Sequence, residues 1–389
     1  MKRVSKVLTA LVLGTVLAGL AAGCGGGEKK ADTIKVGANL EMTGGSASYG
    51  ISSKNAIELA FKEINEKGGI NGKQLELVVA DNKSEAAEAT NAMQKLVSQD
   101  NVVAVIGPTL SSSVIAASAI NNSAKVLDIA PMATNPYVTV DQASGKTKDF
   151  NYRTCFIDPF QGTVMAKFAT AELGVGNAAI LIDNSSDYAK GLAQFFKENF
   201  VKEGGAVTAE ESYLQKDTDF KATLTKIKAT NPDFLYMPGY YQEVGLIVKQ
   251  ARELGMNMPI AGGDGWDSAK MPEIAGAAAL NNTYFSSLYS PEDSSDINKN
   301  FVAAYEKAYG QKPDVFAALS YDSALLVAEA IKNAGSTEPA KISEAMAKIN
   351  GFSGVSGSVT FDDKHNPVKS AVILEYKDGA QSLKTKINP

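Results

Sequence analysis

From residue 33 onward, short apolar runs alternate with longer segments of helical periodicity. Residues 34–40 are the first strand-like run, and between residues 57 and 64 the apolar positions recur at spacings of three, four and seven, as on one face of a helix. Residues 102–106 form a continuous, mostly β-branched run that is typical of a strand buried on both faces of a parallel sheet. We therefore predict a doubly wound parallel sheet for the first part of the chain.

The same alternation restarts after Arg153. Strands are expected at 179–182, 234–237 and 259–261, and helices at 192–200, 245–254, 301–309 and 317–334. Residues 359–361 and 371–374 are expected to pair as two antiparallel strands that close the fold. The complete pattern predicts an α/β protein with two doubly wound, Rossmann-like lobes, and a length of 389 residues fits two domains.

The first 23 residues have the pattern of a signal peptide, with Lys2, Arg3 and Lys6 ahead of an apolar run at 7–22. The run ends in Leu-Ala-Ala-Gly-Cys at 20–24, which resembles the lipobox of bacterial lipoproteins. We expect Cys24 to carry a lipid and residues 24–32 to form a glycine-rich tether to a membrane. An ordinary cleaved signal followed by a stray cysteine is the alternative.

Composition excludes several classes of function. The net charge is −5, and it falls to −8 if the three N-terminal basic residues are removed, which disfavours a nucleic-acid partner. Cys24 and Cys155 are the only cysteines and His365 is the only histidine, so a zinc site and Cys-His or Ser-His-Asp catalysis lack their residues. No phosphate-binding or dinucleotide fingerprint occurs. We expect no metal, no cofactor and no catalytic residues, with Cys155 in the core and His365 exposed in a turn.

Ligands of open α/β sheets bind beyond the carboxyl ends of the strands. The loops at those positions are rich in hydroxyl and aromatic side chains and contain no lysine or arginine. They are residues 43–49, 107–113, 130–136, 184–188, 238–241 and 262–267. A phosphate would be expected to recruit basic side chains, so a smaller anion held by hydroxyls and helix N-terminal N–H groups fits better.

Three features of these loops could bind a ligand, and each has a structural alternative. The serines at 111–113 directly precede a predicted helix, where they could help hold an anion or simply cap the helix. Asp264, between glycines, could hold an ammonium group or cap a short helix. Tyr188 and Tyr240 could be walls of a pocket or partly buried loop residues. An anion site, a cation site and an aromatic wall together describe an amino-acid zwitterion.

Taken together, these segments resemble the periplasmic leucine/isoleucine/valine-binding proteins, the substrate-binding subunits of branched-chain amino-acid ABC transporters. The resemblance rests on residues 34–40 with Thr43-Gly44 and Tyr49-Gly50, Ile-Asn-Glu-Lys-Gly-Gly-Ile-Asn-Gly at 64–72, Val-Ile-Gly-Pro at 105–108 with the serines at 111–113, Ala-Pro-Met-Ala-Thr at 130–134, Asp-Tyr-Ala-Lys-Gly at 187–191 and Ala-Gly-Gly-Asp-Gly at 261–265. It covers nearly the whole chain after Cys24. It implies a type I periplasmic-binding-protein fold, with a ligand between two lobes joined by three crossovers. The implied lobes are residues 33–157 with 288–352 and residues 158–287 with 353–389.

The resemblance also implies roles for individual residues. The ligand carboxylate is expected at Ser111 and Thr134, and its amine at the backbone carbonyl of Met132 and at Asp264. Tyr188 and Tyr240 are expected to close over the ligand, and Tyr49 and Phe316 to line the pocket for its side chain. Asp264 stands where well-known leucine-binding members have glutamate, and Trp266 follows it closely. The identity of the ligand side chain is therefore less firmly implied than its amino-acid backbone.

We accordingly expect an exported, non-catalytic lipoprotein that binds an amino acid, preferably leucine, isoleucine or valine, and delivers it to an ABC permease. It is expected to be monomeric, anchored to the membrane by lipid and without a nucleic-acid partner. One alternative is the same scaffold with an aromatic or polar amino acid, or an amide such as urea. Two others are a sensor subunit and an exported hydrolase, and the sequence shows no nucleophile–base pair for the hydrolase.

Overall fold

The computed structural model describes residues 33–387 and contains two large sheets. The first sheet has five parallel strands. Their spatial order is β2-β1-β3-β4-β5, with β1 (Thr33–Leu40), β2 (Gln74–Asp81), β3 (Ala104–Ile106), β4 (Leu127–Ala130) and β5 (Asn151–Arg153). β3 and β4 are completely buried, as expected of apolar strands covered on both faces. The predicted signal peptide, Cys24 and the tether lie outside the described residues.

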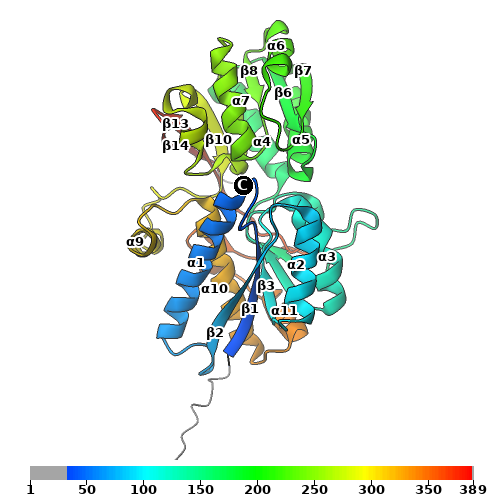
Figure 1. Cartoon of the computed structure of the whole chain (residues 1–389), viewed down its shortest axis with the longest axis vertical. Helices are drawn as coiled ribbons and strands as arrows, with labels where there is room; N and C mark the ends of the chain where they lie inside the picture. The colour runs from blue at the N-terminus through cyan, green and yellow to red at the C-terminus, as the bar shows by residue number, and fades with distance from the viewer. Residues whose placement is uncertain (1–32, 388–389) are drawn as a thin grey trace, which may run out of the picture. The chain divides into compact units, whose positions relative to one another are not determined.

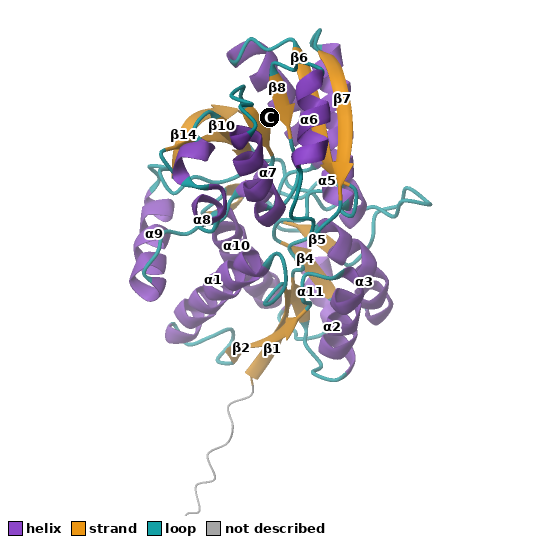
Figure 2. Ribbon diagram, turned by 45° about the horizontal axis from the view of Figure 1, so that its top comes forward, coloured by secondary structure: helices purple, strands orange, loops and turns teal. Residues whose placement is uncertain are grey.

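Helices cover both faces of this first sheet (Figure 1). They are α1 (Ala47–Glu66), α2 (Ala86–Ser98) and α3 (Ser111–Ala124), together with α10 (Val315–Ala334) and α11 (Pro339–Met346) from much later in the chain. α1 packs against α10 and α2 against α3, and Figure 2 shows these two pairs on opposite sides of β1 and β2. A late segment of the chain therefore completes the first sheet's layers.

The second sheet has seven strands in the order β14-β13-β10-β9-β8-β6-β7. Five are parallel: β6 (Asn177–Asp183), β7 (Ala206–Tyr213), β8 (Phe234–Tyr236), β9 (Ile260–Gly262) and β10 (Thr283–Ser287). β13 (Ala371–Lys377) and β14 (Ala380–Ile387) add an antiparallel edge. The associated helices are α4 (Asp158–Lys167), α5 (Asp187–Lys202), α6 (Lys221–Ala229), α7 (Tyr241–Glu253) and α8 (Met271–Ala275), while α9 (Asp296–Tyr309) contacts α1. The predicted α/β fold class is confirmed.

The predicted closing pair of strands is wrong. Residues 357–359 (β12, Gly357–Val359) pair with β11 (Phe352–Gly354) in a separate hairpin, and β13 pairs instead with β10 and β14. The carboxylate of Asp322 in α10 accepts the N–H groups of Val355 and Ser356 at 2.7 and 2.9 Å, which fixes the turn of this hairpin. Each strand of this hairpin has only three residues, which is too short a run to show an alternating pattern.

The two residues that were assigned structural roles behave differently. Cys155 is a free, completely buried thiol, as predicted. His365 was expected to be exposed, but it is half-buried: its ring stacks on Tyr152 with centroids 4.0 Å apart, and its Nδ1 lies 2.9 Å from the carbonyl oxygen of Asn151. The turn therefore folds back onto β5. Across residues 33–387, no helix combines the length and apolar character required to cross a bilayer.

Candidate functional site

A small cavity lies where loops from the carboxyl ends of both sheets meet. It holds about 220 Å³ of empty space between atoms, of which about 10 Å³ can take the centre of a water molecule. Its lining residues are Thr109, Leu110, Ser111, Met132 and Phe316 from the side of the first sheet, and Tyr188, Tyr240, Asp264 and Gly265 from the second. None is basic, and Asp264 is the one ionisable carboxylate among them. The cavity in this conformation has room for about one water molecule.

Asp264 reaches the cavity because the chain after β9 runs close to Tyr188. A Cβ atom at Gly263 would lie 2.3 Å from the Tyr188 hydroxyl oxygen, so a larger residue here would displace that side chain. The Asp264 Oδ1 atom accepts hydrogen bonds from the Tyr188 hydroxyl and from Gln161 Nε2, both at 2.8 Å. Burial raises the pKa of Asp264 to about 6, although these two bonds favour the charged form. A buried carboxylate with no basic neighbour in the cavity is suited to bind a cation.

The capping alternative for Asp264 is not supported. The short 3-10 helix that follows β9 spans Asp264–Trp266, and its N-cap residue is Gly263. The side chain of Asp264 instead accepts hydrogen bonds from Gln161 in α4 and Tyr188 in α5.

The serines at 111–113 form the first turn of α3, which begins three residues before its predicted start. Leu110 is the N-cap residue and makes no side-chain capping bond, so the capping interpretation of the serines is wrong. Ser111 is buried, and its Oγ accepts the N–H of Asn135 at 3.2 Å. N–H groups of a first helical turn have no partner within the helix, and the helix dipole favours an anion there. This end of the cavity can therefore hold a carboxylate.

Two tyrosines form a wall of the cavity, which favours that role over the loop-residue alternative. The rings of Tyr188 and Tyr240 are stacked with centroids 5.4 Å apart and an angle of 16° between their planes. Ser186, the N-cap of α5, donates to the Tyr240 hydroxyl at 3.3 Å. Burial raises the pKa of both tyrosines well above the ordinary value, so both hydroxyls stay protonated.

Tyr49 lies behind the lining residues on the side of the first sheet. Its ring stacks on Phe316 with centroids 3.8 Å apart, and its hydroxyl donates to the Gly265 carbonyl and accepts the Tyr241 N–H at 3.2 Å. Phe316 lines the cavity, and Tyr49 supports it. The pair links α1 and α10 to the loops of the second sheet.

Thr134 and Trp266 do not line the cavity. Thr134 is completely buried, and its carbonyl accepts the N–H of Asp158 at 3.0 Å. Burial raises the pKa of Asp158 to about 8, while the Thr134 hydroxyl acts in the opposite direction. Trp266 points into the core of the second sheet, where its Nε1 donates to the Met237 carbonyl at 3.0 Å. Met132, in contrast, reaches the cavity as predicted for its loop.

Sequence reasoning did not single out Thr109, Leu110, Gly265 and Gln161. The first three belong to loops that were already identified. Gln161 belongs to α4, 103 residues before Asp264, and it also donates to Ser286 Oγ at 2.9 Å. A polar residue within a helix gives no local signal of such a role.

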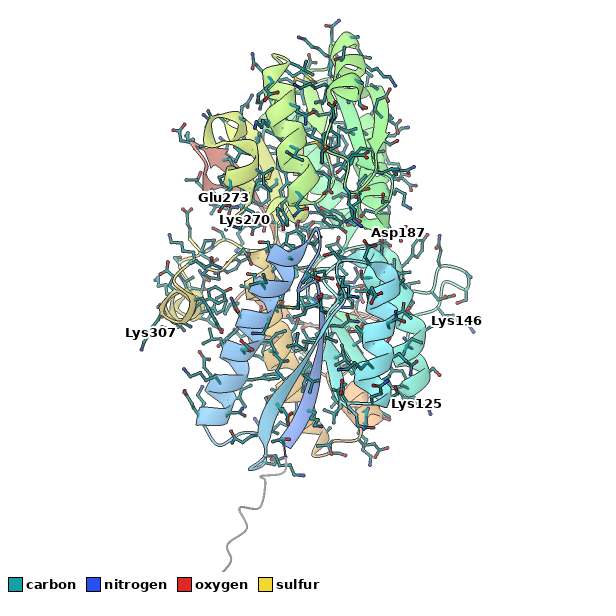
Figure 3. The ribbon with its side chains drawn as sticks, in the orientation of Figure 1. Lys125, Lys146, Asp187, Lys270, Glu273 and Lys307 are labelled. Carbon is teal, nitrogen blue, oxygen red and sulfur yellow. The ribbon has the colours of Figure 1, made fainter. Side chains whose placement is uncertain are left out.

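Hydrogen bonds also join elements of the two sheets. Asp187, labelled in Figure 3, donates its N–H to Ser112 Oγ at 3.0 Å and accepts from Asn135 Nδ2 at 2.9 Å. On the opposite side, the hydroxyls of Ser48 and Ser268 lie 2.9 Å apart. Separation of the two sheets at the cavity would break these contacts.

Within the described part of the chain, no group of three or more His, Cys, Asp or Glu side chains is arranged to hold a metal ion.

Comparison with known proteins gives consistent matches over most of the chain. The model of the family described as "Periplasmic binding protein" matches residues 33–381. A Leu/Ile/Val-binding protein homologue of Brucella suis is 31% identical over 91% of this chain and 93% of its own length.

Two solved structures are similar over 92% of this chain and 99% of theirs. The branched-chain amino acid transporter substrate-binding protein LivJ of Streptococcus pneumoniae, in complex with isoleucine, is 40% identical with a TM-score of 0.85. The leucine-binding protein LivK of Thermotoga maritima is 36% identical with a TM-score of 0.86. These matches confirm the resemblance found in the sequence. The chain belongs to the periplasmic binding protein family.

Proposed function

We propose that this protein is the substrate-binding subunit of an ABC transporter and captures an aliphatic amino acid, preferably leucine, isoleucine or valine. The observation that carries the proposal is that one cavity, without basic residues, contains protein groups that complement both ends of an amino acid. Asp264 supplies a carboxylate at one end, and the first turn of α3 supplies hydroxyl and N–H groups at the other. The relatives that bind isoleucine and leucine by name support this ligand class.

The predicted site residues, except Trp266, have these roles in the proposal. Ser111, with the backbone of the α3 first turn, binds the ligand carboxylate, and Thr134 supports that loop from behind. The ammonium group lies between Asp264 and the Met132 carbonyl. Tyr188 and Tyr240 cover the ligand, and Phe316, backed by Tyr49, faces its aliphatic side chain.

Opening of the two lobes admits the ligand, because the cavity holds about one water molecule while the contacts between the sheets are made. The lobes are residues 33–157 with 288–352 and residues 158–287 with 353–389. Small-angle scattering should show a smaller radius of gyration with saturating ligand than without it. An unchanged radius in a protein that is open without ligand would contradict closure.

Calorimetric titration with the twenty amino acids and urea tests the ligand class. We expect the strongest binding with leucine, isoleucine or valine, and none with urea. Strong binding of an aromatic or polar amino acid, or of urea, would overturn the aliphatic assignment. No turnover of the bound amino acid is expected, because no histidine, cysteine or lysine lines the cavity.

We also propose that the protein is exported as a monomer and anchored by a lipid on Cys24, facing the periplasm or the cell exterior. The signal-peptide pattern and the Cys24 motif support this proposal. Cys24→Ala should release the protein into the soluble fraction or leave an uncleaved precursor. A variant that stays processed and membrane-bound would contradict the anchor.

A further inference from the structure

A buried carboxylate that no ligand role explains lies behind Thr109. Glu41 directly follows β1 and is completely buried. It accepts a hydrogen bond from Thr109 Oγ1 at 2.6 Å, one from the Thr109 N–H at 3.3 Å and one from Asn82 Nδ2 at 3.1 Å. It forms no ion pair with any residue in the described range 33–387. These donors favour the ionised form of Glu41.

The loop that contains Thr109 packs closely against the end of β1, next to Glu41. Gly107, two residues earlier, has a φ of +89°, and a Cβ atom there would lie 2.5 Å from the Asn39 carbonyl oxygen. The loop after β3 therefore packs directly on the end of β1. Asn82 in turn donates to Asn39 Oδ1 at 3.2 Å, so Glu41 belongs to a connected polar network. Such a network fixes the orientation of its members.

This arrangement decides what Thr109 can present to the cavity. An ionised carboxylate only accepts hydrogen bonds, and a threonine hydroxyl has a single proton to donate. That proton goes to Glu41, so the hydroxyl cannot donate to a ligand. Burial raises the pKa of Glu41, while the bonds from Thr109 and Asn82 favour the ionised form. With Oγ1 directed at Glu41, the γ-methyl group is the part of the Thr109 side chain that remains to face the cavity that this residue lines.

We propose that Glu41 is a positioning residue that holds the methyl group of Thr109 toward the ligand side chain and so makes the site prefer valine to threonine. The two amino acids have the same shape and differ by a methyl and a hydroxyl group. The inference rests on the proposed function, because it requires an amino acid in the cavity. It assigns the preference to a residue that does not itself touch the ligand.

The test is the ratio of the Kd for threonine to the Kd for valine, measured by calorimetry in a double-mutant cycle. Glu41→Gln replaces one acceptor oxygen with an N–H donor, which allows Thr109 to accept a bond and turn its proton toward the cavity. The ratio should fall by about three- to tenfold in the parent background, the effect of one hydrogen bond. In the Thr109→Val background, the same substitution should change the ratio by less than about twofold, because no hydroxyl remains to turn.

Glu243→Gln is the matched control. Glu243 is also a buried carboxylate that accepts a backbone N–H, that of Lys216 at 2.9 Å, but it does not line the cavity. Its substitution should leave the ratio within about twofold of the parent value. An unchanged ratio in Glu41→Gln, or an equal fall in both backgrounds, would overturn the role of Glu41.

Thr109→Ser provides a second arm if Glu41→Gln fails to fold. This variant keeps the hydroxyl for Glu41 and removes the methyl group, so the Kd for valine should rise about three- to fivefold. An unchanged Kd for valine would overturn the inference. A parent protein that binds neither valine nor any other aliphatic amino acid would instead overturn the proposed function itself.

Discussion

The loop after β3 presents hydroxyl and N–H groups to the cavity, whereas the loop after β9 presents the carboxylate of Asp264. Both loops contain or contact a buried acid, but the acids are placed differently. Glu41 lies behind the first loop and receives donors from Thr109 and Asn82 on both of its oxygens. Asp264 lines the cavity, and the hydrogen bonds that it accepts from other side chains both go to Oδ1.

Under the proposed function, this difference allows the two regions to bind opposite ends of one ligand. Both oxygens of Glu41 already accept hydrogen bonds from residues of the first region, so this carboxylate orients those residues and does not bind a ligand. One oxygen of Asp264 accepts no side-chain hydrogen bond, so it can accept one from a ligand. The first region therefore contributes donors to the site, and the second contributes the negative charge. Neither region alone complements a zwitterion, so the strongest tests remove one side at a time.

Removing the charge of the second region should have the largest effect. Asp264→Ala leaves a desolvated ammonium group without its partner, and truncation of such pairs costs about 2–5 kcal/mol. Calorimetry should show amino-acid binding weakened by about 30-fold to several thousand-fold. Asp264→Asn, which keeps one acceptor, should lose less.

A deaminated analogue of the best ligand provides the control for Asp264. It lacks the ammonium group, so it should bind the parent poorly, and Asp264→Ala should discriminate less between the analogue and the amino acid. Equal affinity of the parent and Asp264→Ala for the amino acid would show that the two regions do not divide the zwitterion in this way.

Acid should weaken the second region without any substitution. The pKa of Asp264 is raised by burial to about 6, so its carboxyl is ionised at pH 7.5 and becomes protonated as the pH falls below 6. A protonated carboxyl loses its charge attraction for the ammonium group, so proton and ligand compete. Affinity should fall by up to about tenfold per pH unit below pH 6. Titrations between pH 4.5 and 7.5 check this, and an equally steep decline in Asp264→Asn would assign the effect to another group.

Sequence patterns predicted the buried strands well because burial on both faces leaves a continuous apolar run, as at residues 102–106. β14 was missed because most of its residues are polar and partly or fully exposed at the edge of the sheet. The hairpin of β11 and β12 was missed because each strand has only three residues, too few to show an alternating pattern.

The candidate site divides in the same way. Asp264, Tyr188 and Tyr240 could be identified because ligand-binding loops follow the strands of an α/β sheet. Trp266 is only two residues from Asp264, but the 3-10 turn directs it into the core. Glu41 and Gln161 could not be identified, because their roles arise from contacts with residues 68 and 103 positions away. Of the two buried carboxylates, Asp264 could thus be predicted from the sequence and Glu41 could not.

Contacts that hold the two regions together should have smaller effects than the charge itself. Ser112→Ala removes the acceptor of the Asp187 N–H, a bond of 3.0 Å between α3 and the start of α5. One such hydrogen bond contributes about 0.5–1.5 kcal/mol, so ligand affinity should fall about two- to tenfold through a less stable closed state. Ser118→Ala is the control from the same helix, since Ser118 Oγ donates within α3 to the Ile115 carbonyl. If the two variants weaken binding equally, the bond to Asp187 does not contribute to closure.

The exposed ion pair between the regions should have the smallest effect. Lys216 Nζ lies 2.6 Å from Glu85 Oε1, but the two side chains are 71% and 45% exposed. The bond to Glu85 raises the pKa of Lys216, so the lysine stays charged at every pH at which the ligand binds. Water and salt screen a pair this exposed, so Lys216→Ala should weaken binding by about twofold or less, and the difference should disappear in high salt. Lys221→Ala, which breaks a similar pair with Glu253 on the side of the second sheet alone, is the control. A loss above tenfold that persists in high salt, and is absent in Lys221→Ala, would mean that this ion pair, and not the hydrogen bonds of Ser112 and Tyr49, joins the two regions.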